Sequence, residues 1–204
     1  TRMDEPLGHM IGNSLEVIES IDCLKGKGPS DLMEVTYALS AEMLILGGIE
    51  STQEGAMTAL KGAINSGAAL EGFRALVEAQ GGDGTVVDNY NYLPRTGKTK
   101  DILLDNDSSM YVQGLDARSF GDAACILGAG RVSTDSIIDP SVGIELLKKV
   151  GQAVQPNEAI ARIHYQGVDA LEAAEARLEK AIKLSSKKPV SSSLIIDQIS
   201  YENY

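Results

Sequence analysis

The sequence predicts an α+β protein, in which a helical segment is followed by a domain of short strands and helices. Residues 13–82 carry apolar side chains at helical spacing, interrupted by glycines that end each run. Beyond Pro94 the pattern changes to short β-like runs separated by turn residues. The boundary between the two patterns falls near residues 84–98, and we expect two domains, at residues 1–93 and 94–204.

Four helices are expected in the first part, because each has its own start and stop signals. Asn13 with Glu16, and later Ser51 with Glu54, match the capping box, in which two polar side chains satisfy free N–H groups of the first turn. Ser30 is the expected N-cap of the second helix. The four helices are expected to begin at Asn13, Ser30, Ser51 and Ala69 and to end before Gly26, Gly47, Gly67 and Gly81.

The second of these helices is apolar over a wide arc. Its apolar side chains at helical spacing are Leu32, Val35, Leu39, Met43 and Leu46. A helix that is apolar around much of its surface is usually buried. We therefore expect this helix to be central in its domain.

The second part is expected to contain short strands and two helices. Residues 142–150 fit both the strand and the helix period, and we favour a strand. Residues 151–163 indicate a hairpin with its turn at Pro156 and Asn157, and its second strand over residues 158–165. Further strands are expected at residues 102–104, 110–115 and 194–199, and helices at residues 118–127 and 171–181.

The charge and apolarity of the chain limit its partners. The 204 residues carry a formal net charge of −11. Nucleic-acid binding without sequence preference depends on Lys and Arg that neutralise phosphates, so no nucleic-acid partner is expected. No apolar run approaches the roughly 20 residues of a membrane helix, so we expect no membrane partner and a cytoplasmic protein. Cys23 and Cys125 lie in neither a metal nor a redox spacing, and we expect two inert thiols.

Several motifs resemble one enzyme family. The opening TRMDEPLG (residues 1–8), continued by GNSLEV (residues 12–17), is similar to a segment of thymidine and pyrimidine-nucleoside phosphorylases. The motifs AQGGD, GAGR, IDPSVG and VGQAV follow in the family's order, at residues 79–83, 128–131, 138–143 and 150–154. The resemblance covers essentially the whole chain. It implies that the helical segment is part of the nucleoside phosphorylase α/β domain, and that residues 94–204 form the family's C-terminal α/β hammerhead domain.

The resemblance also implies an activity. Family members cleave pyrimidine nucleosides with phosphate and release the base and a pentose 1-phosphate. Phosphate and a pyrimidine nucleoside are therefore the implied partners, in a cytoplasmic, homodimeric pentosyltransferase of nucleoside salvage that has no organic cofactor. The family's phosphate- and base-binding motifs lie upstream of the part that this sequence resembles. We therefore assign no catalytic and no substrate-binding residue here, and we expect the 204-residue chain alone to be inactive and its helices to show apolar surface where a missing sheet belongs.

A potassium site is a further implication of the resemblance. In bacterial members, main-chain carbonyls at a Pro-Leu-Gly turn and three residues later hold the ion together with a glutamate of the following helix. The matching positions here are Leu7, Met10 and Glu19. Carbonyl oxygens that replace the water shell, together with one negative charge, suit a monovalent cation. The alternative is that Glu19 is a solvated residue in the first turns of a helix, where the helix dipole favours it.

Some short motifs have both a functional and a plain structural interpretation. Residues 95–99, RTGKT, end like a P-loop, but Tyr92 stands where its first glycine should be, so a solvated basic linker is favoured. Residues 128–131 could cradle an anion with Arg131 as a clamp, but a tight turn is favoured. His9 and His164 have no metal-ligand partners at a suitable spacing, and a structural role is the default for both.

A second class of function stays open beside the enzyme. Residues 151–163 resemble the hairpin of biotinyl and lipoyl domains, which would make this a non-catalytic binding or interaction module. A carrier domain presents a modifiable lysine on a tight turn soon after that hairpin, whereas HYQG stands at residues 164–167. The module would therefore lack the carrier lysine. A self-standing regulatory or interaction protein related to the family is also open.

Overall fold

The computed structural model describes residues 1–131, 133–190 and 192–199, and within them the chain forms two compact units. The helical unit consists of residues 1–2, residues 18–92 and the described residues from 193 onward. The mixed unit consists of residues 3–17 and 93–192. The early segment 3–17 thus belongs with residues that lie far downstream in the sequence.

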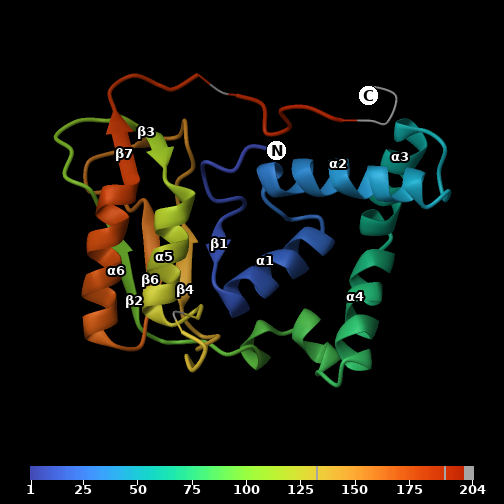
Figure 1. Ribbon diagram of the computed structural model, residues 1–204, viewed down its shortest axis with the longest axis horizontal. Helices are drawn as coiled ribbons and strands as arrows, with labels where there is room; N and C mark the ends of the chain where they lie inside the picture. The colour runs from blue at the N-terminus through green and yellow to red at the C-terminus, as the bar shows by residue number, and fades with distance from the viewer. Residues whose placement is uncertain (132, 191, 200–204) are drawn as a thin grey trace. The chain divides into compact units, whose positions relative to one another are not determined.

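The helical unit is built from the predicted helices, followed by two short 3-10 turns (Figure 1). Its elements are the larger part of α1 (Asn13–Leu24), α2 (Ser30–Leu46), α3 (Gln53–Asn65), α4 (Ala68–Ala79), η1 (Gly84–Val87) and η2 (Tyr90–Tyr92). No helix in the part of the chain that the structure describes is long and apolar enough to cross a membrane.

The helix starts differ in detail from the predicted caps. The Glu16 carboxylate accepts the N–H of Gly12 at 2.9 Å, one residue before the predicted partner. Thr52 rather than Ser51 caps α3, because its hydroxyl accepts the Gly55 N–H at 3.1 Å. No side-chain cap precedes Ser30. The periodicity therefore located the helices correctly, whereas the capping residues were misplaced by about one position.

The prediction that α2 is central is wrong. Leu39, Met43 and Leu46 are 53%, 69% and 85% exposed, while Val35, one turn before Leu39, and Ala41, on the opposite side of the helix, are buried. Residues three and four positions apart share a helix face, so these three side chains form one apolar stripe. A wide apolar arc shows that a helix is suited to burial on several sides. It does not show that residues of the same chain pack against all of those sides.

The mixed unit contains two antiparallel sheets and two helices. The first sheet has the order β1-β4-β6-β2, formed by β1 (Met10–Ile11), β4 (Gly143–Leu146), β6 (Ala161–His164) and β2 (Thr99–Ile102). The second has the order β5-β3-β7, formed by β5 (Ala153–Val154), β3 (Met110–Leu115) and β7 (Ile182–Ser185). Helices α5 (Ala117–Leu127) and α6 (Val168–Ala181) lie side by side against the first sheet (Figure 1).

The core of the mixed unit lies between these helices and the sheets. In β4, Ile144 and Leu146 alternate with a half-buried residue, as expected for a strand with one covered face. Phe120 of α5 and Leu178 of α6 are fully buried in the same cluster. The choice of strand over helix is confirmed for residues 143–146, whereas residues 147–150 lie outside the strand.

Two other strand predictions are wrong. β5 pairs with β3 and β6 pairs with β2 and β4, so the predicted hairpin of residues 151–163 has a turn, but its strands join different sheets. Residues 194–199 form no strand; the chain instead forms β7 directly after α6. Strand pairing depends on partners distant in sequence, which the local pattern of apolar residues does not specify.

Candidate functional site

The segment that contains two of the predicted cation ligands, residues 6–10, is held by β4. The His9 carbonyl accepts the Leu146 N–H at 2.7 Å, and the His9 Nδ1 lies 2.7 Å from the Leu146 carbonyl oxygen. Met10 is paired with Glu145 in the β1–β4 ladder. His9 therefore has the structural role that was favoured for it, as the residue that joins this segment to the sheet.

Lys149 holds the same segment at its other end. Its ammonium donates hydrogen bonds to the main-chain carbonyls of Pro6 and Gly8, the latter at 3.0 Å. Gly8 is buried and has a φ of +71°, in the left-handed region that favours glycine. The sequence gives no signal for Lys149, because nothing in a run of two lysines distinguishes one from the other.

The three predicted cation ligands occupy different surroundings. Leu7 is exposed and Met10 is partly buried in β1, and both belong to the mixed unit. Glu19 belongs to the helical unit and is only 7% exposed. Its burial shows that the alternative of a solvated Glu19 is wrong. A carboxylate and main-chain carbonyls are ligands that fit a monovalent cation chemically, but the set of three stays a prediction.

Cys23 lies one turn after Glu19 in α1. Its thiol is 9% exposed, and burial, with further contributions from the charges of Glu19, Asp22 and Asp31, raises its pKa to about 11. The thiolate is the reactive form, so a raised pKa makes the thiol unreactive.

The motifs at residues 12–17 and 138–143 meet in the mixed unit. The Ser14 N–H donates to the Pro140 carbonyl at 3.2 Å. Gly12 and Gly143 cross so closely that a Cβ on Gly143 would lie 2.3 Å from the carbonyl oxygen of Ile11. Two of the sequence motifs are thus explained by one close backbone crossing.

The GAGR motif ends helix α5. Gly128 has a φ of +107°, and its N–H bonds back to the Cys125 carbonyl at 3.0 Å. The Gly128 carbonyl accepts the Asp139 N–H, and Asn13 Nδ2 donates to the Ala129 carbonyl at 2.8 Å. The tight-turn interpretation is confirmed, because these backbone groups bond within the protein.

The comparisons with known proteins agree with this arrangement of motifs. A family model described as the pyrimidine nucleoside phosphorylase C-terminal domain matches residues 111–185. Over 198 residues the chain is 39% identical to the pyrimidine-nucleoside phosphorylase of Geobacillus stearothermophilus, a match that covers 97% of this chain and 45% of that relative. The chain belongs to the pyrimidine-nucleoside phosphorylase family.

A second relative supports the same membership. Over 162 residues the chain is 44% identical to the pyrimidine-nucleoside phosphorylase of Staphylococcus aureus strain USA300, which covers 79% of this chain and 37% of that relative. The chain therefore spans less than half the length of these curated relatives. Its helices and small antiparallel sheets give the α+β class that was predicted.

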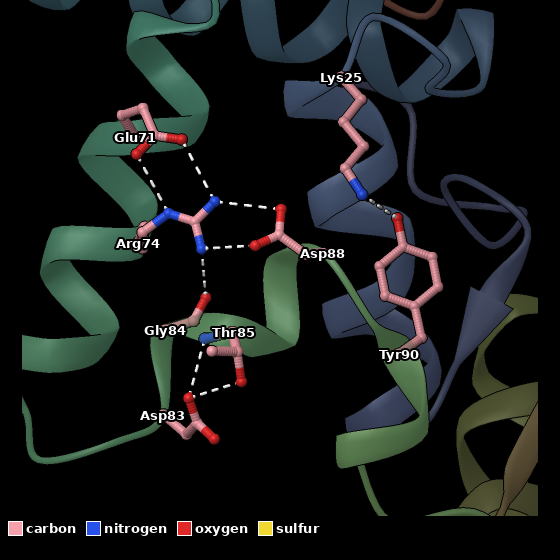
Figure 2. A network of polar contacts seen from close by, with 8 residues as sticks. All are labelled: Lys25, Glu71, Arg74, Asp83, Gly84, Thr85, Asp88 and Tyr90. Atoms are coloured by element: carbon pink, nitrogen blue, oxygen red, sulfur yellow. Dashed lines mark hydrogen bonds and ion pairs between the residues drawn. The ribbon is translucent and has the colours of Figure 1, made fainter.

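A network of polar contacts in the helical unit surrounds Arg74 (Figure 2). Its guanidinium bonds both carboxylate oxygens of Asp88, at 2.9 and 3.1 Å, and both of Glu71, at 3.1 and 3.3 Å. It also donates to the Gly84 carbonyl at 2.9 Å. The network fastens η1 to α4, and because all five guanidinium N–H groups donate to partners in this unit it has a structural role.

A second contact shown in Figure 2 joins Tyr90 of η2 to Lys25, the residue that follows α1. Lys25 Nζ donates to the Tyr90 hydroxyl at 3.1 Å and lies 4.6 Å from the centroid of its ring. The Tyr90 hydroxyl donates to Asp22 at 2.5 Å. Burial, followed by this hydrogen bond, raises the pKa of Tyr90 above its usual range, so the hydroxyl stays protonated as a donor.

His164 lies in a charged row on the first sheet. Its Nε2 is 3.8 Å from Glu145 Oε2, too long for a hydrogen bond, while Arg162 pairs with Asp101 at 2.7 Å. Burial lowers the pKa of His164, and the charges of Arg162 and Arg95 lower it further against the opposing effect of Glu145. No group of three or more His, Cys, Asp or Glu side chains suited to a metal occurs among the described residues.

The RTGKT segment is bonded to the chain after β6. The Thr96 hydroxyl donates to the Tyr165 carbonyl at 2.7 Å, and Lys98 Nζ donates to the Gln166 carbonyl at 3.0 Å. The Lys98 bond uses the ammonium that a P-loop would direct at a nucleotide. The segment is therefore a tethered connection rather than a fully solvated linker.

Proposed function

We propose that this chain is part of a phosphorylase that cleaves the N-glycosidic bond of pyrimidine nucleosides. A phosphate oxygen forms a bond to the anomeric carbon, the bond from that carbon to the base nitrogen breaks, and its electron pair leaves with the base. The products are the base and a pentose 1-phosphate. The observation that carries the proposal is the identity of 39% and 44% to relatives named pyrimidine-nucleoside phosphorylase. The active form would be a cytoplasmic homodimer.

We further propose that the 204-residue chain does not catalyse this reaction by itself. Binding a phosphate dianion requires converging N–H groups, hydroxyls and cationic side chains. The two glycine-containing candidates use such groups internally: Gly128 ends a helix, and Thr96 and Lys98 bond to carbonyls. The phosphate and nucleoside would thus be held mainly by residues outside this chain.

The intact enzyme would contain a potassium ion bound by the carbonyls of Leu7 and Met10 and by the carboxylate of Glu19. The ion would supply a fixed positive charge beside the buried carboxylate. Support comes from the family resemblance of these positions and from the burial of Glu19. The alternative of a non-catalytic binding module stays open, with β5 and β6 in different sheets.

A chimera tests the proposed activity. This chain would be joined to the part of the Geobacillus stearothermophilus enzyme that it does not match. We expect release of thymine from thymidine and of uracil from uridine that requires phosphate and yields a pentose 1-phosphate. Base release that is independent of phosphate, or no release by a folded chimera, would contradict the proposal.

A further inference from the structure

Lys148 and Lys149 are neighbours whose ammonium groups contact different residues. Lys148 forms an ion pair with the Glu158 carboxylate at 2.6 Å. Lys149 donates to two main-chain carbonyls, those of Pro6 and Gly8. These carbonyls belong to the residues on either side of Leu7. Because both oxygens accept from the same ammonium, they converge on it.

Converging carbonyl oxygens are the chemistry by which proteins bind monovalent cations, because the oxygens replace the water shell of the ion. A lysine ammonium is a compact positive charge with three donors and can occupy such a position. The cost of removing it from water is offset only if polar partners surround it.

The position of the ammonium is prepared by a tight turn. The Lys149 N–H donates to Gln152 Oε1 at 2.9 Å, and the Gln152 N–H donates to the Lys149 carbonyl at 3.1 Å. Gly151 within this turn has a φ of +87°. The turn therefore holds the Lys149 backbone independently of the bonds that its side chain makes to the Pro6 and Gly8 carbonyls.

We propose that Lys149 is a tethered monovalent cation. Its ammonium takes the place of a free cation at the turn of residues 6–8. Because it binds the carbonyls of both neighbours of Leu7, it positions the peptide group of Leu7. Lys149 is thus a positioning residue for the carbonyl ligands of the potassium site. This last step rests on the proposed function, whereas the tethered cation rests on the geometry alone.

The tethered cation is tested by chemical rescue in the 204-residue chain. Lys149→Ala removes the ammonium and leaves room for methylammonium, which carries the same charged group. In choline chloride we expect the variant to unfold at a lower temperature than the original chain. In methylammonium chloride at the same ionic strength, its unfolding temperature should rise again by several degrees. The original chain should respond equally to both salts. Methylammonium that stabilises both proteins alike, or neither, would overturn the proposal.

Lys148→Ala is the matched control, because it removes a neighbouring ammonium that pairs with Glu158. We expect no selective recovery by methylammonium in this variant, and an equal recovery would also overturn the proposal. If Lys149→Ala does not fold in choline chloride, the measurement is whether it folds in methylammonium chloride. Folding there would support the proposal, and failure to fold there would refute it.

The positioning role is tested in the chimera. Lys149→Met keeps the bulk of the side chain without the charge, and we expect roughly a tenfold higher potassium concentration at half-maximal activity, with Lys149→Arg close to the original. An unchanged potassium dependence would contradict the positioning role. Failure of the proposed function would leave the chimera itself inactive, while the rescue experiment would still decide whether Lys149 is a tethered cation.

Discussion

Glu19 is the residue whose burial bears most directly on the proposed cation site. Because its carboxylate is 7% exposed, Glu19→Gln would remove a buried charge while keeping the shape of the side chain. In the active chimera we expect weaker potassium binding, seen as a rise of about tenfold in the half-saturating concentration, which corresponds to about 1.4 kcal/mol. Circular dichroism should show an unchanged helix content. The same potassium dependence in both proteins would count against Glu19 as a ligand.

His164 makes stability depend on pH. Its folded-state pKa is lowered, first by burial, so the unfolded chain binds a proton more readily. The contribution of His164 to stability is therefore complete above its unfolded pKa of about 6.5 and is lost as the pH falls through the folded value. We expect the denaturant concentration at half-unfolding to decrease as the pH is lowered below about 6.5. The decrease should be smaller in His164→Gln. Parallel pH profiles of the two proteins would refute this assignment.

Cys23 should be an unreactive thiol. Burial and neighbouring carboxylates raise its pKa to about 11, so almost no thiolate forms at pH 8. We expect Cys23→Ser to leave the labelling of the native protein at pH 8 almost unchanged, whereas Cys125→Ser removes most of it. Fast labelling of Cys23 in the folded Cys125→Ser variant would be inconsistent with its environment.

At the residue scale, sequence alone could suggest the cation positions but not their surroundings. Leu7, Met10 and Glu19 follow from a motif, whereas the burial of Glu19 and the role of Lys149 depend on contacts with distant parts of the chain. Lys148 and Lys149 are indistinguishable in sequence, and only the fold gives them different partners.

Among the elements, the crossing of β1 and β4 is the most sensitive to added volume. Gly143→Ala would place a methyl group 2.3 Å from the Ile11 carbonyl and 2.9 Å from Leu15 Cδ1. Because the nearest atom belongs to the backbone, we expect a loss of about 3 kcal/mol or more in the free energy of unfolding, measured with denaturant.

Gly121→Ala is the matched control for this substitution. Gly121 lies inside α5, in the same unit, and a Cβ there would meet no atom within 4 Å. Alanine is a better helix former than glycine, so we expect a gain of about 0.5 to 1 kcal/mol. A similar effect of both substitutions would refute the close crossing.

Elements with local signals were predicted better than those with distant partners. The helices follow from 3.6-residue periodicity and glycine stops, and residues 110–115 were identified as a strand from their composition. β5 and β6 were assigned to one hairpin because they are adjacent in sequence, yet they join different sheets. Residues 194–199 have the pattern of a strand. The Arg2 N–H donates to the Leu194 carbonyl, but a single backbone hydrogen bond does not make the repeated pairing of a strand.

For the whole molecule, the apolar stripe of α2 predicts self-association of the isolated chain. Leu39, Met43 and Leu46 expose a continuous apolar face that would be buried in a larger assembly. We expect the chain to associate with increasing concentration in sedimentation experiments, and Met43→Glu with Leu46→Glu to reduce this association.

Val168→Glu is the control for that pair of substitutions. Val168 is 60% exposed at the start of α6, in the mixed unit and not in α2, so its change should leave self-association unaltered. A chain that stays monomeric at all concentrations would show that the stripe does not drive association.

The central claim is that this chain belongs to a nucleoside phosphorylase but does not itself bring phosphate and nucleoside together. Holding two reactants in line contributes roughly 7 to 11 kcal/mol to catalysis, and electrostatic stabilisation of the departing base adds to it. The most direct test measures thymine release from thymidine and phosphate by the purified 204-residue chain, free of host phosphorylase. We predict no release above background, with the chimera as the active comparison. Sustained phosphate-dependent turnover by the chain alone would contradict the claim.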